Sequence, residues 1–138
     1  MAKAKILVVD DEPQVLQVVA SILDRAGYAT TTEPEPLRAL EIIAAAGSFD
    51  LVLSDVVMPG MRGPELAERI RRLSPSSSVI LMSGGVPAGQ LPRGIPFLGK
   101  PFSSSDLTRA VGKALRKSSR QRGPAAPPLA LSAGCKGQ

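Results

Sequence analysis

Short apolar runs alternate with amphipathic stretches along most of this chain. The first run, Lys5–Val9, has no polar position after its lysine, which predicts a strand buried on both faces. The stretch after it has the 3.6-residue apolar period of a helix, begins at Pro13 behind three acidic residues and ends before Gly27. The predicted apolar stripe of this helix consists of Val15, Leu16, Val18, Val19, Ile22 and Leu23.

The same alternation continues to about Leu115. Strands are expected at 28–32, 49–55, 78–82 and 95–98, and helices at 37–46, from Pro64 through Leu73, and from Ser103 to about Leu115. Ser103 with Asp106 resembles a capping box at the start of the last helix, with Asp in place of the usual Glu or Gln. Strands that alternate with helices imply right-handed crossovers and a mostly parallel sheet covered on both faces. We therefore predict a doubly wound α/β domain.

The C-terminal stretch differs in composition from the rest. Residues 1–115 carry twelve basic and twelve acidic side chains, and the excess of five comes from Arg116, Lys117, Arg120, Arg122 and Lys136. We expect one domain over residues 1–117 and a disordered basic tail over residues 118–138, whose Ser, Gly and Pro content does not favour a packed core. A solvated tail is favoured over weak attachment to an acidic partner or a nucleic acid.

Several functional classes are disfavoured by what the chain contains. Its apolar runs are all much shorter than the roughly 18 residues of a membrane span, and its start does not resemble a signal peptide, so we expect a cytoplasmic protein. It has no histidine, and its one cysteine is Cys135, so the common zinc ligands and an internal disulfide are excluded.

Polar residues follow four of the predicted strands. Asp10 and Asp11 follow the first, Asp55 ends the third, Ser83 follows the fourth and Lys100 follows the last. The carboxyl ends of parallel strands lie along one edge of the sheet, so these side chains should meet there. Clustered carboxylates repel one another unless a cation lies among them, and a site with oxygen ligands alone suits Mg²⁺.

This group of residues suits the transfer of a phosphoryl group to Asp55. Asp55 is the best candidate for the nucleophile, because it ends the central strand between the acid pair and the Ser83/Lys100 pair. The phosphoryl oxygens would then face Mg²⁺, Lys100 and the Ser83 hydroxyl. Taken singly, each of these residues would be read as a helix cap, a turn or a solvated loop residue. Their joint placement at strand ends favours the functional interpretation.

Four motifs in order strengthen this interpretation. They are the acid pair Asp10-Asp11, Asp55 within Ser-Asp-Val-Val-Met-Pro-Gly, Met-Ser-Gly ending at Gly84, and Phe-Leu-Gly-Lys-Pro-Phe ending at Phe102. From Lys5 to about Leu115 the chain resembles the response-regulator receiver family. The resemblance implies a flavodoxin-like fold of five parallel strands in the order 2-1-3-4-5.

The resemblance also implies roles for single residues. Asp55 would be the phosphoacceptor, Asp11 and Asp55 would bind Mg²⁺ with the Val57 carbonyl, and Asp10 would assist through water. Ser83 and Phe97 would form the switch, and Lys100 would contact the phosphoryl group. The protein would take a phosphoryl group from a histidine kinase or a histidine phosphotransfer protein and signal through a partner protein, with no attached DNA-binding domain. It would catalyse only its own Mg²⁺-dependent phosphorylation and dephosphorylation.

Other functional classes fit less well. A haloacid-dehalogenase-like phosphatase needs a second acid two residues after the nucleophile, where this chain has Val57. A flavodoxin-like cofactor binder needs a phosphate loop where this chain has Asp10-Asp11-Glu12, which would repel a phosphate. A receiver that acts as a docking or scaffold module, independent of phosphorylation, remains open.

The segment between Ser83 and Lys100 is unusual. It carries four glycines and three prolines before Phe97, which interrupt any helical apolar period. We therefore expect the fourth helix of the receiver pattern to be short or missing. Since the usual receiver dimer packs that helix against its counterpart, we also expect a monomer.

Overall fold

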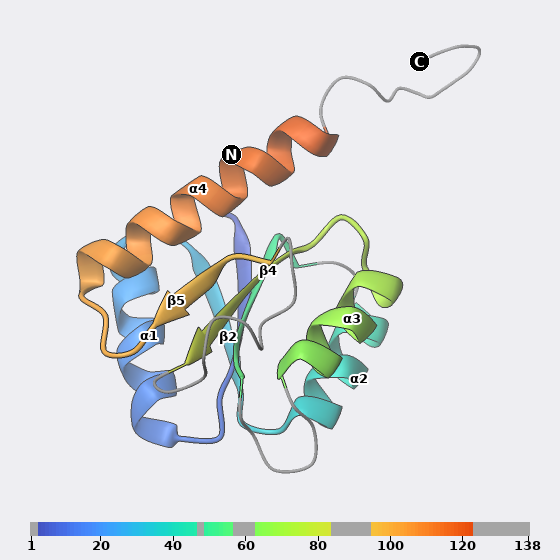
Figure 1. Ribbon diagram of the computed structural model, residues 1–138, viewed down its shortest axis with the longest axis horizontal. Helices are drawn as coiled ribbons and strands as arrows, with labels where there is room; N and C mark the ends of the chain where they lie inside the picture. The colour runs from blue at the N-terminus through green and yellow to red at the C-terminus, as the bar shows by residue number, and fades with distance from the viewer. Residues whose placement is uncertain (1–2, 47–48, 57–62, 84–94, 123–138) are drawn as a thin grey trace.

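The computed structural model describes residues 3–46, 49–56, 63–83 and 95–122. Five parallel strands form one sheet in the order β2-β1-β3-β4-β5 (Figure 1). One helix lies in each connection from β1 to β4, and another follows β5. The elements are β1 (Lys5–Val9), α1 (Pro13–Arg25), β2 (Ala29–Glu33), α2 (Pro36–Ala46), β3 (Leu51–Asp55), α3 (Gly63–Leu73), β4 (Ser78–Ser83), β5 (Phe97–Gly99) and α4 (Ser104–Arg122). The predicted doubly wound, flavodoxin-like fold and its strand order are confirmed.

The two faces of the sheet are covered by different helices. Helices α1 and α4 lie on one face and α2 and α3 on the other (Figure 1). Along β1, Ile6 and Val8 pack under α1 and α4, whereas Leu7 and Val9 pack under α2 and α3. Successive strand residues point to opposite faces, so a strand covered on both sides needs an unbroken apolar run. This explains the short apolar runs in the sequence.

The apolar stripe of α1 is narrower than predicted. Leu16, Val19 and Leu23 are buried against the sheet, but Val18 is 58% exposed. The prediction that Val18 packs in the core is therefore wrong, because helical rotation turns it away from the face that residues 16, 19 and 23 share. Leu73, expected in the stripe of α3, is likewise half exposed at the end of its helix.

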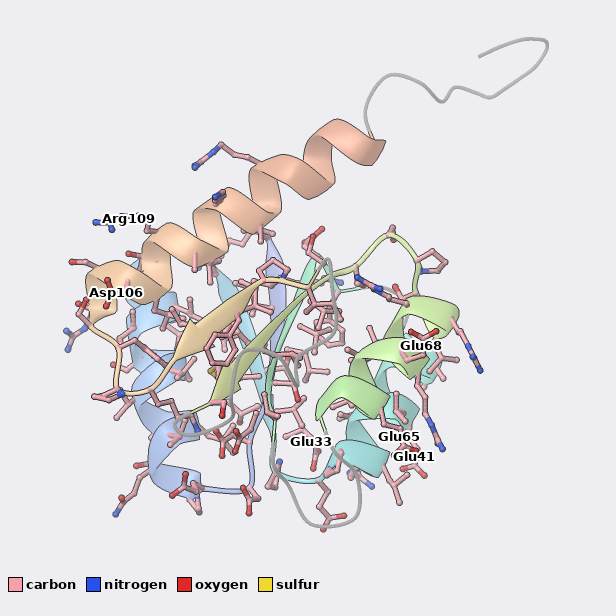
Figure 2. The ribbon with its side chains drawn as sticks, in the orientation of Figure 1. Glu33, Glu41, Glu65, Glu68, Asp106 and Arg109 are labelled. Atoms are coloured by element: carbon pink, nitrogen blue, oxygen red, sulfur yellow. The ribbon has the colours of Figure 1, made fainter. Side chains whose placement is uncertain are left out.

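Helix α4 begins as predicted and ends later than predicted. The Ser103 hydroxyl accepts from the Asp106 backbone N–H at 3.0 Å, and the Asp106 carboxylate accepts from the Ser103 N–H at 3.1 Å. These hydrogen bonds and the charge of Arg109 hold the pKa of Asp106 below its ordinary value. Figure 2 shows Asp106 and Arg109 together at this end of the helix. The expected capping box is thus confirmed with Asp in the acidic position.

The C-terminal boundary of α4 corrects the sequence prediction. The helix continues to Arg122, beyond both Leu115 and the boundary expected at residue 117. The apolar period stops near Leu115, but the next residues include good helix formers, and the strong helix breakers Gly123 and Pro124 come only afterwards. Residues 123–138, with Cys135 and Lys136, lie outside the described residues, so the disordered tail stays a prediction.

Two further expectations concern the fourth helix of the receiver pattern and a membrane span. Residues 84–94, which contain most of the segment expected to lack a full fourth helix, lie outside it, so the short helix and the monomer stay predictions. Within the described ranges, no helix is both long and apolar enough to cross a membrane.

Candidate functional site

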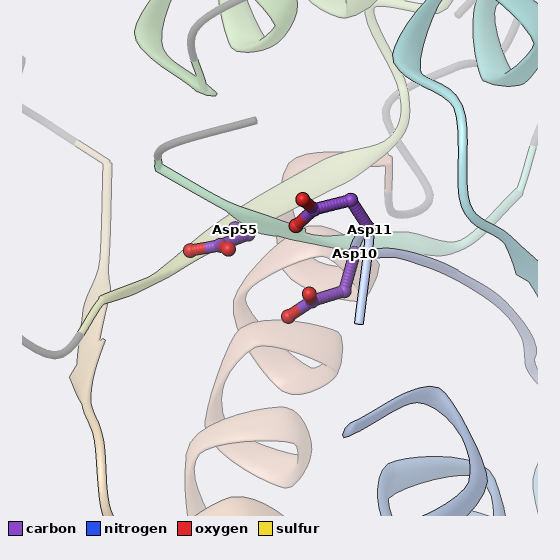
Figure 3. Close-up of side chains that lie close together, drawn as sticks. All are labelled: Asp10, Asp11 and Asp55. Carbon is purple, nitrogen blue, oxygen red and sulfur yellow. The ribbon is translucent and has the colours of Figure 1, made fainter. Parts of the chain in front are cut away.

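Three carboxylates meet at the carboxyl edge of the sheet. Asp10 and Asp11 follow β1, and Asp55 ends the neighbouring strand β3, whose Ser54 is in register with Val9. One carboxylate oxygen from each of the three acids lies within 4.8 Å of the others (Figure 3). Asp10 is fully buried, Asp55 is nearly so and Asp11 is exposed. The sequence prediction that these acids converge is therefore correct.

Lys100 brings an ammonium group into the same cluster. It directly follows β5, and its backbone N–H donates to the Ser83 carbonyl at 2.7 Å, which joins the ends of β4 and β5. Its Nζ lies 3.0 Å from Asp10 Oδ2, 3.6 Å from Asp55 Oδ2 and 3.9 Å from Glu12 Oε1. The peptide bond between Lys100 and Pro101 is cis.

The pKa of Lys100 reflects two opposing effects. Partial burial lowers its pKa, but the hydrogen bond to Asp10 and the charges of Asp10, Asp55 and Glu12 outweigh that effect. The pKa of Lys100 is therefore raised above its ordinary value, and the side chain stays protonated at neutral pH. A permanently charged ammonium beside Asp55 suits the stabilisation of an incoming anion.

Asp10 differs from the other two acids in its contacts. Its Oδ1 accepts from the Glu12 backbone N–H at 3.0 Å, and its Oδ2 accepts from Lys100. Both oxygens are thus engaged within the protein, so Asp10 suits an indirect role, while Asp11 and Asp55 are better placed to hold a cation. The carboxylates of Asp10, Asp55 and Glu12 lie within ion-pair distance of Lys100, and Asp11 adds a fourth carboxylate to the cluster. This excess of negative charge and the oxygen-only donor set fit Mg²⁺.

The structure describes two of the three remaining predicted site residues. Ser83 is buried at the end of β4, one residue beyond Met82, which is in register with Asp55. Phe97 begins the edge strand β5 and is 42% exposed. Val57 lies outside the described residues.

Two residues near the site were not singled out from the sequence. From the sequence, Glu12 is expected at a helix start and in an acidic run that would repel a phosphate, not beside Lys100. Its nearness to Lys100 depends on a contact between segments far apart in the chain. Ser54 interrupts the apolar run of β3, and its hydroxyl donates to the Asp55 carbonyl at 3.0 Å. The polar residue within a buried run was the available signal for Ser54.

An apolar groove lies beside this edge of the sheet. It has a volume of about 430 Å³ and runs between α1 and the segment that follows β5. Its lining includes the exposed Val18 and also Lys100, so the groove reaches the charged cluster. The lining residues are Gln14, Val15, Val18, Val19, Lys100, Pro101 and Phe102.

Known proteins are similar to this chain in sequence. The response regulator receiver domain family matches residues 6–112. The response regulator receiver protein CpdR of Brucella abortus is 31% identical over 116 residues, which cover 80% of this chain and 96% of CpdR. The transcriptional regulatory protein YkoG of Bacillus subtilis is 31% identical over 122 residues, 85% of this chain and 53% of YkoG. The sensor kinase CckA of Brucella abortus is 36% identical over a match that covers 13% of its length.

Solved structures of receiver proteins superimpose on this chain. A CheY-like receiver domain protein from Methanospirillum hungatei superimposes with a TM-score of 0.81 at 26% identity, covering 87% of this chain and 99% of that one. The chemotaxis response regulator CheY4 of Vibrio cholerae gives a TM-score of 0.74 at 26% identity, covering 82% of this chain and 99% of that one. The chain spans about half the length of YkoG and a small part of CckA. With the family matched over most of its length and the strand order confirmed, the chain belongs to the response regulator receiver domain family of two-component systems.

Proposed function

We propose that this receiver domain accepts a phosphoryl group on Asp55 from a phosphohistidine and signals through a partner protein. The observation that carries the proposal is the contact of one lysine with the acid cluster, with Lys100 Nζ 3.6 Å from Asp55 Oδ2. A carboxylate between a predicted cation site and a fixed ammonium is suited to attack phosphorus, because both positive charges can stabilise the phosphoryl oxygens.

In this reaction an Asp55 oxygen attacks phosphorus and the bond between phosphorus and the donor imidazole nitrogen breaks. The electron pair of that bond returns to the imidazole, and the product is an acyl phosphate on Asp55. The donor is a histidine kinase or a histidine phosphotransfer protein, since this chain has no histidine. The domain acts only on itself, through Mg²⁺-dependent phosphorylation and dephosphorylation.

Mg²⁺ would be held by Asp11, Asp55 and the Val57 carbonyl, with Asp10 acting through water, and it would neutralise charge on the phosphoryl oxygens. Lys100, protonated and already within ion-pair distance of Asp55, would pair with one phosphoryl oxygen. The Ser83 hydroxyl would meet another. Each charged oxygen then has a partner contributed by this edge of the sheet.

The signal would pass through Ser83 and Phe97. Phe97 is partly exposed on the edge strand, as expected for the outward state of a switch residue before phosphorylation. Ser83 and Lys100 are joined by a backbone hydrogen bond, so a change at the phosphoryl group can reach β5 directly. We expect phosphorylation to turn Phe97 inward and alter the surface that a downstream protein recognises.

The apolar groove gives the phosphodonor a place to dock. Val15 and Val18 present apolar surface on α1, and the groove extends to Lys100 and so to the acid cluster. A protein that carries the phosphohistidine could bury these side chains and bring the imidazole to Asp55. Val18, which is 58% exposed and lies outside the core, favours this role.

A gel that retards phosphoproteins tests the proposal. The wild-type protein incubated with acetyl phosphate and Mg²⁺ should show a retarded band, and Asp55→Asn should show none. The alternative, a scaffold receiver independent of phosphorylation, predicts no retarded band for either protein. Retardation of Asp55→Asn equal to that of the wild type would overturn the choice of acceptor.

A further inference from the structure

Helix α4 carries a row of exposed cations on the face opposite the core. Leu107, Val111 and Ala114 are buried, whereas the basic residues of the row are exposed at intervals of four and three positions, the spacing of one helical face. These residues, named here the basic face, are Arg109, Lys113 and Arg116. Within the described chain, no ion pair involves Lys113 or Arg116.

The helix carries this row to the amino edge of the sheet. The Ser78 hydroxyl, at the start of β4, donates to the Ala114 carbonyl at 3.4 Å, so residue 114 lies level with the amino edge of the sheet. The turns after it project beyond the sheet (Figure 1). From Arg109 to Arg116 the row is about 10 Å long, at about 1.5 Å per residue.

The net positive charge of the chain comes from α4. The helix contains six basic residues and one acid, Asp106, which is engaged with Ser103 in the capping box. The rest of the chain has equal numbers of basic and acidic residues, so α4 accounts for the entire net charge of +5. The basic residues of α4 are Arg109, Lys113, Arg116, Lys117, Arg120 and Arg122.

The surroundings of the basic face disfavour several kinds of binding partner. The apolar side of α4 is buried against the sheet, so the helix cannot lay an apolar face into a membrane surface. The helix has no aromatic residue on which single-stranded bases could stack. The described large exposed apolar side chains all lie on other elements, so the face lacks the apolar centre typical of a protein interface.

We infer that the basic face of α4 binds double-stranded nucleic acid through its phosphate backbone. A duplex carries one negative charge per about 1.7 Å of its axis, so a row of cations on a straight helix meets phosphates without a sequence-specific fit. Interfaces with nucleic acid are polar and strongly basic, as this face is.

The position of the face keeps this binding apart from the phosphorylation chemistry. Helix α4 begins just after Lys100 at the carboxyl edge and runs to the opposite edge, so its basic end is far from Asp55. The acids at the carboxyl edge would repel a phosphate backbone, which favours contact at the far end. A bound duplex should therefore leave the labelling of Asp55 by acetyl phosphate unchanged.

Fluorescence anisotropy of a labelled duplex of about two helical turns tests the inference on the full chain. Binding should weaken steeply between about 50 and 200 mM salt, with a slope of log affinity against log salt of about −4 to −5 for five or so neutralised phosphates. Lys113→Gln/Arg116→Gln should reduce the slope by about 2 and weaken binding about tenfold at low salt. Gln has a helix propensity close to that of Lys and Arg, and circular dichroism checks that α4 is intact.

The matched control is Arg69→Gln/Arg72→Gln on α3, which removes the same net charge from the other side of the sheet. Arg69 and Arg72 already pair with Glu65 and Glu68 of their own helix, at 3.1 and 3.8 Å. This control should bind the duplex within twofold of the wild type. Equal losses in the two variants, no binding at low salt, or tighter binding to a single strand, to polyglutamate or to anionic vesicles would each overturn the inference.

Discussion

Charged residues are crowded and partly buried at one edge of the sheet, and exposed and separated at the other. At the carboxyl edge, Asp10 is fully buried and Lys100 Nζ lies within 3.0 to 3.9 Å of three different carboxylates. Toward the amino edge, Lys113 and Arg116 are exposed and separated along one face of α4. The same fold therefore crowds charge at one edge and spreads it at the other.

The difference shows what each set of charges can do. Crowded and partly buried charges raise the pKa of Lys100, orient one another and create a demand for a cation, which are the conditions for chemistry at a single atom. Exposed and separated charges interact only weakly with one another. They favour a ligand that is itself an extended array of charge. Matched substitutions at the two edges separate these roles.

Among variants that keep the acceptor Asp55, the largest effect is expected from Asp11→Asn. The amide removes one of the two carboxylates best placed to hold Mg²⁺, so the rate of labelling by acetyl phosphate should fall about 100-fold or more. Intact-mass measurement over time gives the rate. Asp24→Asn, an exposed acid at the other end of α1, changes charge equally and should leave the rate unaffected. Comparable rates in Asp11→Asn and the wild type would remove Asp11 from the metal site.

A smaller effect, specific to the phosphodonor, is expected from Val18→Asp. A charge in the apolar groove should slow transfer from a phosphohistidine donor protein about tenfold and leave labelling by acetyl phosphate unchanged. Leu37→Asp is the matched control, because Leu37 on α2 is 57% exposed against 58% for Val18. If both variants slow transfer equally, or neither does, the groove is not the docking site.

Asp55→Asn should stabilise the metal-free protein by about 1 kcal/mol, because it removes one negative charge from a crowded cluster. Lys100 keeps its closer partner Asp10, so little attraction is lost. Urea unfolding with and without Mg²⁺ measures the change, which should shrink or reverse when Mg²⁺ is bound to the wild type. Destabilisation of the metal-free protein would show that attraction to Lys100 dominates at Asp55.

The smallest effect concerns the pH dependence of stability. Because the folded pKa of Lys100 is raised, its contribution to stability is fully present below the ordinary lysine pKa of about 10.4 and is lost as the pH rises through the folded value. Without Mg²⁺, the wild type should lose stability above about pH 10 more steeply than Lys100→Gln. Lys113→Gln, at the exposed edge, should keep the wild-type slope. Equal slopes in all three proteins would show that Lys100 is not coupled to the acids.

The fold could be predicted well because its central strands are covered on both faces. Ile6–Val9 needs apolar side chains at every position, and such runs alternating with helical periods leave few topologies open. The predicted buried face of α1 and the predicted end of α4 were wrong. Val18 belongs to an apolar stripe wider than the arc that the sheet covers, and α4 continues after its apolar period ends because nothing breaks the helix before Gly123.

The candidate site was predictable as a set of residues but not as a set of contacts. Asp10, Asp11 and Asp55 meet because parallel strands end at one edge, a rule that needs only the order of elements. The pairing of Lys100 with Asp10 spans 90 positions in the chain and depends on side-chain conformations that no local pattern encodes. The same holds for Glu12, whose nearness to Lys100 follows from the placement of β5.

The most direct test of the central claim is to locate the acyl phosphate itself. Borohydride reduction of the protein labelled with acetyl phosphate and Mg²⁺, followed by peptide mass spectrometry, converts a phosphorylated aspartate to homoserine and marks its position. We expect homoserine at Asp55 alone, and none when Mg²⁺ is chelated. Homoserine at Asp10 or Asp11, or no homoserine at any position in the presence of Mg²⁺, would contradict it.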